Sequence, residues 1–186
     1  FLTRFNWVAT DAIGSKLFSM PMVPNPLMFE QRQAGISPIT IQPTMLGYVA
    51  LPFAFWKGDL VLDIQVFASK YHTGRLAIAA HYGVPFGSEV TTTADFQYMR
   101  VIDVADQSTS HSIRFPYKAR TEYQRVPELT ATPVGSGNEL DYSMGVISIS
   151  VLNHLQAPDT VSQDIDVALF WSAGPGFDLS FPRQLD

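Results

Sequence analysis

The chain has 186 residues and a formal net charge of −5, and charged residues make up 16% of it, compared with about 25% in an average soluble domain. Because it contains no cysteine, a disulfide-stapled module, a thiolate zinc site and a cysteine nucleophile are all excluded. The net negative charge argues against a nucleic-acid-binding domain, which needs clustered Lys and Arg to attract the phosphate backbone.

Apolar and polar residues alternate in short blocks from the amino terminus onward, which is the pattern of strands buried on one face. The first strand is predicted over Phe1–Ala9, and a weaker one over Lys16–Val23. A short helix is expected next, over Thr44–Phe55, with the Thr44 hydroxyl as its N-cap. The clearest strand is Asp59–Ser69, where every second residue is apolar.

The alternation continues through the second half of the chain. The predicted strand Arg75–Tyr82 follows the turn Tyr71–Gly74, so it either pairs with the preceding strand in a hairpin or lies opposite it in a sandwich. A second short helix is expected over Thr93–Tyr98. Three further strands are predicted at Ser110–Ala119, Tyr142–Leu152 and Asp164–Ser172.

Together these elements predict an all-β fold of about eight antiparallel strands in a two-sheet sandwich, with long loops and one or two short helices. A jelly roll is the leading topology. The length fits one domain over residues 1–186, and no apolar run reaches the roughly 18 to 20 residues of a membrane helix. Long loops in a compact domain usually carry function, so contacts with other molecules are expected at Pro24–Pro43, Gly83–Thr93 and Glu122–Glu139.

Ten residues around two turns and near the last strands carry a family resemblance. An aromatic-Trp-basic-Gly turn precedes the clearest strand, and an Ala-Ser-Lys-aromatic-His-x-Gly-Arg-Leu turn follows it. The residues are Trp56, Gly58, Ser69, Lys70, His72, Gly74, Arg75, Pro116, Tyr117 and Asp178. This set resembles the signature of picornavirus-like capsid subunits, and it is most similar to those of the insect dicistroviruses and iflaviruses.

The resemblance implies an eight-stranded jelly roll of two four-stranded sheets with a structural, non-enzymatic function. Such a subunit assembles with other capsid subunits of its polyprotein, and with copies of itself around symmetry axes, into an icosahedral shell around a positive-strand RNA genome. Its location is then the virion, assembled in the host-cell cytoplasm. Genome contact is expected to be weak and nonspecific, a host receptor stays open as a further partner, and an N-terminal arm is expected to precede this chain.

Several of these residues have a physical reason to lie where they do. Gly58 and Gly74 are expected to take positive φ angles at tight turns, and Trp56 is expected to bury a large apolar area. Lys57 and Lys70 place charge at strand ends. Two interpretations of the lysines remain open, contact with neighbouring subunits or simple solvation of the turns.

No catalytic, cofactor or metal site is expected from the sequence. The chain has no His-x-His pair, which a jelly-roll metal site would need, and no Gly-x-Ser-x-Gly motif. The four histidines are therefore expected at ordinary surface or turn positions. They are His72, His81, His111 and His154.

A different class of function remains as the alternative, a stand-alone jelly-roll lectin whose loop aromatics stack on sugars. Tyr82, Phe86 and Tyr123 are the candidates for such a platform. Their spacing does not require it, and a lectin has no need of the turn signature around Trp56 and His72.

Overall fold

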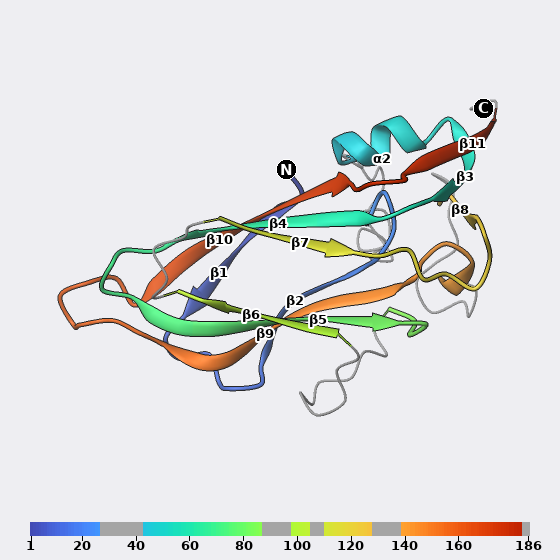
Figure 1. Cartoon of the computed structure of the whole chain (residues 1–186). Helices are drawn as coiled ribbons and strands as arrows, with labels where there is room; N and C mark the ends of the chain where they lie inside the picture. The colour runs from blue at the N-terminus through green and yellow to red at the C-terminus, as the bar shows by residue number, and fades with distance from the viewer. Residues whose placement is uncertain (27–42, 87–97, 105–109, 128–138, 184–186) are drawn as a thin grey trace, which may run out of the picture.

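The computed structural model describes residues 1–26, 43–86, 98–104, 110–127 and 139–183. Within these residues the chain forms two four-stranded sheets and a small three-stranded sheet at one end (Figure 1). The strands are β1 (Thr3–Val8), β2 (Lys16–Pro21), β3 (Phe53–Lys57), β4 (Leu60–Phe67), β5 (Thr73–Tyr82), β6 (Tyr98–Asp103), β7 (Ser110–Phe115), β8 (Gln124–Arg125), β9 (Gly145–Gln156), β10 (Asp164–Ala173) and β11 (Asp178–Pro182). Helix α2 covers Met45–Ala50, and the 3₁₀ turn η2 covers Glu139–Asp141.

The two large sheets face each other as the layers of an antiparallel sandwich. The first has the strand order β1-β10-β4-β7 and the second β2-β9-β5-β6. The predicted jelly-roll fold with two four-stranded sheets is thereby confirmed. Strands β4 and β5 follow each other in the chain but belong to different sheets, so they lie opposite each other and are not a hairpin (Figure 1).

The core lies between these sheets and is built by the period-two alternation. In β4 the residues Leu60, Leu62, Ile64 and Val66 are buried, and the residues between them face outward. The buried residues of β5 and β9 with the same parity complete the facing layer. Burying one such aliphatic side chain contributes about 1.5 to 3 kcal/mol. Every second position of β4 is therefore apolar, and this alternation is what predicted the strand from the sequence.

The predicted helix over Thr44–Phe55 is wrong in its second half. The N-cap is confirmed, since the Thr44 hydroxyl accepts a hydrogen bond from the Gly47 amide at 3.0 Å. The helix ends at Ala50 because Pro52 has no amide hydrogen to donate within a helix. Phe53 begins strand β3, which pairs with β11 on one side and β8 on the other.

The sequence missed strands β3, β6, β8 and β11. Tyr98 begins β6 and is not helical as predicted, while the rest of the expected helix at 93–97 lies outside the described residues. Strand β8 has two residues and β3 is apolar on both faces, so neither shows alternation. The loops expected to carry contacts lie mostly outside the described residues, at 27–42, 87–97 and 128–138.

Candidate functional site

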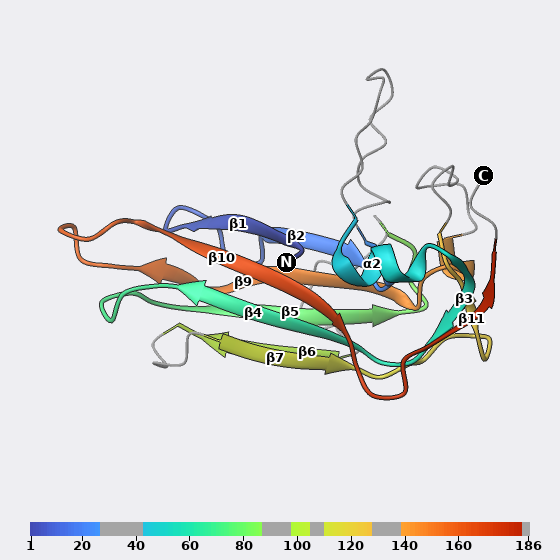
Figure 2. The same cartoon turned by 90° about the horizontal axis from the view of Figure 1, so that it is seen from above.

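The ten signature residues fall into two groups at opposite ends of strand β4 (Figure 2). The small-sheet cluster, at the end where the third sheet lies, contains Trp56, Gly58, Pro116, Tyr117 and Asp178. The turn cluster, at the β4–β5 connection, contains Ser69, Lys70, His72, Gly74 and Arg75.

Trp56 is the centre of the small-sheet cluster. Its side chain is fully buried, and its indole Nε1 donates a hydrogen bond to the carbonyl of Tyr142 at 3.2 Å. The ring meets Tyr117 edge-on, with centroids 5.6 Å apart, and stacks on Phe177 at 6.2 Å. Trp56 therefore joins β3 to three segments that are distant in the sequence, and the expected burial is confirmed.

Gly58 lies where two turns touch through their backbones. Its φ is +112°, and a Cβ there would come within 2.4 Å of the Gly176 carbonyl oxygen and of the Phe177 Cα. The next residue continues the contact, because the Gly174 amide donates to the Asp59 carbonyl at 2.8 Å. Only glycine combines this φ with so close an approach, so the expected positive φ at Gly58 is confirmed.

The carboxylate of Asp59 ties the start of β4 to the end of β7. It is 8% exposed, and it accepts hydrogen bonds from Arg114 Nε at 2.5 Å and from the Tyr117 amide at 2.8 Å. The sequence did not indicate these two contacts, because Arg114 and Tyr117 follow Asp59 by 55 and 58 residues in the chain. The only available signal was the position of Arg114 on the polar face of a predicted strand.

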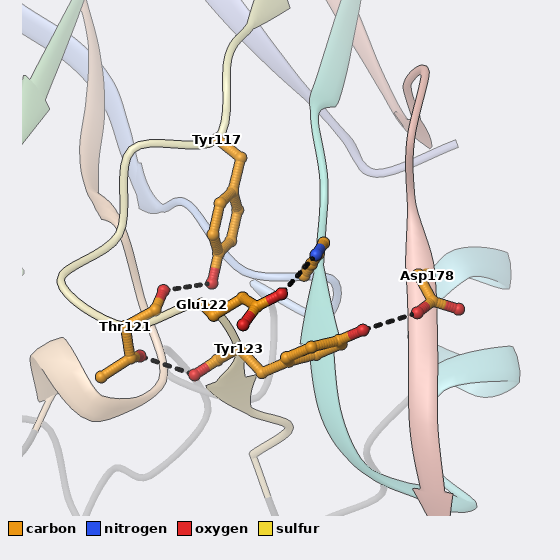
Figure 3. Close-up of polar contacts among 6 residues, drawn as sticks. Tyr117, Thr121, Glu122, Tyr123 and Asp178 are labelled. Carbon is orange, nitrogen blue, oxygen red and sulfur yellow. Dashed lines mark hydrogen bonds and ion pairs between the residues drawn. The ribbon is translucent and has the colours of Figure 1, made fainter.

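A second set of polar contacts fastens β3, the segment before β8 and β11 to one another (Figure 3). Lys57 donates to Glu122 at 3.0 Å and lies 4.8 Å from the centre of the Tyr123 ring. The Tyr123 hydroxyl donates to Asp178 at 3.0 Å, and the Tyr117 hydroxyl to the Thr121 carbonyl at 3.2 Å. These side chains bind one another and so hold the three segments together.

The pKa values in this set are shifted away from neutral pH. The hydrogen bond from Lys57 to Glu122 raises the pKa of Lys57, and the hydrogen bond to Asp178 raises the pKa of Tyr123. Burial raises the pKa of Tyr117 to about 12. A general acid or base needs a pKa near the working pH. Raised pKa values at Lys57, Tyr117 and Tyr123 instead fit side chains that hold the three segments together.

In the turn cluster, His72 is a buried bridge between two loops. It is 4% exposed, its Nδ1 accepts from the Ser69 amide at 3.1 Å, and its Nε2 lies 2.9 Å from the Ser162 carbonyl. Because a carbonyl can only accept, Nε2 is assigned the proton. The bridge fastens the β4–β5 turn to the β9–β10 loop.

The expectation that the histidines occupy surface or turn positions is confirmed for His72 and wrong for His81. His72 does lie in a turn, but its ring is buried. His81 is 1% exposed and lies 3.0 Å from the Ser148 hydroxyl of the adjacent strand β9. Buried polar groups need hydrogen-bond partners, and these partners come from segments that the sequence alone did not bring together.

Gly74 corrects a second expectation, because its φ is not positive. Its hydrogen in place of a side chain is needed for packing. A Cβ would lie 2.7 Å from the ring of Trp7 and 3.1 Å from the His154 carbonyl oxygen. Trp7 is fully buried, so the ring has little room to move.

Replacing Gly74 with alanine should therefore destabilise the fold by about 1 to 3 kcal/mol, the usual range for overpacking a core. Urea denaturation followed by tryptophan fluorescence measures this change. The matched control is Gly83→Ala, since a Cβ at Gly83 meets nothing within 4 Å, although its φ is +73°. Gly83→Ala should lose about 1 kcal/mol from its φ alone, and a loss at Gly74→Ala below about 0.5 kcal/mol would contradict a packing role for Gly74.

Arg75 and Lys70, the two charged residues of the turn cluster, make only solvent-exposed side-chain contacts within the described residues. Arg75 donates to Asp103 across the β5–β6 pair at 2.9 Å, and both side chains are substantially exposed. The Lys70 ammonium lies 5.1 Å from the Tyr71 ring centre. Exposed pairs of this kind contribute little to stability, so these contacts leave the charges available to solvent or to a partner.

Asp164 closes the same end of the sandwich and should show acid-dependent behaviour. The Ser162 hydroxyl and then the Asn6 amide, which donates at 3.1 Å, lower the pKa of Asp164. A lowered pKa stabilises the fold above the unfolded value, near 3.9, and this stability is lost as the pH falls through the folded value. The acid-sensitive window therefore lies below about pH 4.

An NMR titration of the Asp164 carboxyl carbon tests this assignment. Ser162→Ala should raise the pKa of Asp164 more than Asn6→Ala, because the hydroxyl is the larger cause of the shift. Gln163→Ala, which removes hydrogen bonds only to backbone carbonyls, should leave the titration unchanged. An unchanged pKa in Ser162→Ala would show that the hydroxyl does not hold this carboxylate.

The described residues contain no group of three or more His, Cys, Asp and Glu side chains that could hold a metal ion. No helix in the described part of the chain is long and apolar enough to cross a membrane. Of the aromatics proposed for sugar stacking, Tyr82 and Tyr123 each have a lysine of the same chain over the ring, Lys118 at 5.2 Å and Lys57 at 4.8 Å. A lysine ammonium therefore already lies near each of these rings.

Comparison of the sequence with known proteins finds segments of viral polyproteins, while no family model matches. The chain is 30% identical over 172 residues to the genome polyprotein of avian encephalomyelitis virus (strain Van Reokel), which covers 91% of the chain and 8% of the polyprotein. The genome polyprotein of human hepatitis A virus genotype IIA is 28% identical over 177 residues, again 91% and 8%. The chain thus spans a small part of these polyproteins.

Comparison of the fold finds proteins of solved virus particles. A chain of black queen cell virus matches with a TM-score of 0.78 and 23% identity, covering 100% of this chain and 75% of its own. A chain of the Triatoma virus empty capsid matches at 0.78 and 21%, covering 98% and 72%. A chain of deformed wing virus matches at 0.80 and 22%, covering 98% and 46%. The fold is shared across these particles, whereas the sequence relatives come from avian and human viruses.

Proposed function

We propose that this chain, which has the jelly-roll fold of Picornavirales capsid proteins and is similar in sequence to a segment of picornavirus genome polyproteins, is a structural subunit of an icosahedral virus shell. The observation that carries the proposal is the agreement of two independent comparisons, since sequence and fold both match over more than nine-tenths of the chain. The role is structural rather than enzymatic.

The geometry of the signature residues supports this function. At both ends of β4 they are used to fasten turns and loops to the sandwich, through Trp56 and Gly58 at one end and His72 and Gly74 at the other. Rigid loop positions favour repeated assembly, because a partner then binds a surface that needs no ordering. The residues of the signature act, in this proposal, by shaping contact surfaces and not by making reactive centres.

The proposed partners are the other capsid subunits of the same polyprotein and further copies of this chain around the symmetry axes. Contact with the RNA genome is proposed to be weak and nonspecific, in keeping with the formal charge of −5. A host receptor is the remaining partner, and assembly in the host-cell cytoplasm is the proposed origin of the particle.

Co-expression of the chain with its sibling polyprotein segments, followed by sedimentation and negative-stain electron microscopy, tests the function. Uniform icosahedral particles that contain this chain are the expected result. A monomer that persists in the presence of the siblings would overturn the assembly role. A glycan array on the same preparation then tests the lectin alternative, which nothing in the described residues favours.

A further inference from the structure

The backbone of Phe181 has an unusual conformation near the C-terminal end of the described residues. Phe181 has a φ of +58°, and no other non-glycine residue in the described ranges has a positive φ. Side chains with a Cβ are disfavoured in this region, and a following proline pushes the preceding residue toward extended conformations. Phe181 precedes Pro182 and therefore opposes both preferences.

Burial of the Phe181 ring does not account for this conformation. The side chain is 71% exposed, and its ring contact in the chain is an edge-on approach to Phe55 with centroids 5.7 Å apart. The β11–β3 ladder pairs the residues on either side of it, Ser180 with Phe55 and Pro182 with Phe53. The backbone pairing of Ser180 and Pro182 with β3 thus holds Phe181 in its strained conformation.

Arg183 is the anchor on the far side of Phe181. Its amide donates to the Pro52 carbonyl at 2.7 Å, and its guanidinium donates to the carbonyls of Leu51 at 2.9 Å and Pro127 at 3.4 Å. Leu51 and Pro52 connect helix α2 to β3, and β3 lies beside β11 (Figure 1). Arg183 therefore fastens the end of strand β11 to that connection, directly after the turn at Phe181.

The near side of the strand is anchored separately. Asp178 accepts the Tyr123 hydroxyl at 3.0 Å, and Phe177 stacks on Trp56. Between these anchors β11 is an edge strand, and among the described strands it pairs with β3 alone. A strand with one neighbour and a strained residue is a natural unit of local opening.

We propose that Phe181–Arg183 is a latch that closes strand β11 against β3 and opens as a unit while the sandwich stays folded. Closure depends on the Arg183 contacts, and the strain at Phe181 favours opening. In the open state the backbone amide and carbonyl groups of β3 that face β11 lose their hydrogen-bond partners. The latch follows from the geometry of this chain and does not depend on its assembling into a shell.

Native-state hydrogen exchange on the full chain tests the latch. Arg183→Ala should speed exchange of the Asp178 and Ser180 amides, the two that face β3, by about tenfold or more while amides of β4 and β5 are unchanged. Phe181→Gly should slow the same two amides by about tenfold, because glycine takes the positive φ without the penalty. The matched control is Ser180→Gly, which adds a glycine without relieving the strain and should not slow exchange.

Phe181→Ala separates backbone strain from the loss of the aromatic ring, since alanine keeps the Cβ. It should not slow exchange. The proposal is overturned if Phe181→Gly and Ser180→Gly behave alike, if Phe181→Ala slows exchange as much as Phe181→Gly, or if β11 amides always exchange together with those of β4. The comparison of the glycine variants decides the question even if Arg183→Ala does not fold.

Discussion

Replacing Trp56 with alanine should lower the free energy of unfolding by about 3 to 5 kcal/mol, the range observed when a large aromatic residue is removed from a core. The side chain is fully buried, and its loss leaves a cavity between Tyr117 and Phe177. The carbonyl of Tyr142 also loses the indole donor. Chemical denaturation followed by circular dichroism measures the effect without relying on tryptophan fluorescence.

A conservative variant and a surface control make this test specific. Trp56→Phe should recover part of the stability, because it restores aromatic contact but not the hydrogen bond to Tyr142. Tyr48→Ala removes an aromatic ring that is 65% exposed on helix α2, so it should change stability by no more than about 0.5 kcal/mol. A loss at Trp56 no larger than that at Tyr48 would contradict a central role for Trp56.

The second large effect is expected at Gly58. Gly58→Ala should destabilise the fold by about 3 kcal/mol or more, because the new Cβ combines an unfavourable φ with a collision. The colliding atoms belong to the backbone of Gly176 and Phe177, so no side-chain rotation relieves them. The two turns must separate, which also weakens the stacking of Phe177 on Trp56.

Gly14→Ala is the matched control for Gly58. Gly14 also has a positive φ, +83°, but a Cβ there meets nothing within 4 Å. Its substitution should therefore carry only the conformational penalty, about 1 kcal/mol. If thermal and chemical unfolding gave the same loss for both variants, close packing of the two turns would not be the reason for glycine at position 58.

The substitutions Trp56→Ala and Gly58→Ala should also separate folding from assembly. Both act on the small-sheet cluster, which holds β3 and β11 against the end of the sandwich. We expect Gly58→Ala chains that still fold at low temperature to give fewer particles in the co-expression experiment than Gly14→Ala chains. The comparison shows whether a correctly placed third sheet is needed for subunit contacts.

Much of the sandwich follows from local sequence. The alternation in β4, β5, β9 and β10 predicts strands with one apolar face, because residues two apart lie on the same side of a strand. The Thr44 N-cap is predicted in the same local way, since a threonine hydroxyl just before a helix can accept a hydrogen bond from an amide of the first turn, here that of Gly47. Both signals depend on neighbours within a few positions of each other.

The candidate site was only partly predictable. The turn signature gave the residues of both clusters, and a positive φ was expected at Gly58 for the correct reason. The same expectation failed at Gly74, where the constraint is the ring of Trp7, 67 positions away in the numbering. The partners of Asp59 and His72, which are Arg114 and Ser162, were likewise invisible before the chain was folded.

The sequence by itself determined that the segments of β1, β2, β4, β5, β7, β9 and β10 are strands, because apolar side chains recur at every second position there. Only the tertiary structure decided that β4 and β5 lie in opposite sheets and that β3, β8 and β11 form a third sheet. It also decided that Phe181 is held in a strained turn by Arg183. Strand pairing and backbone contacts of this kind depend on which distant segments meet. The alternation of apolar and polar residues within one segment contains no information about its partner.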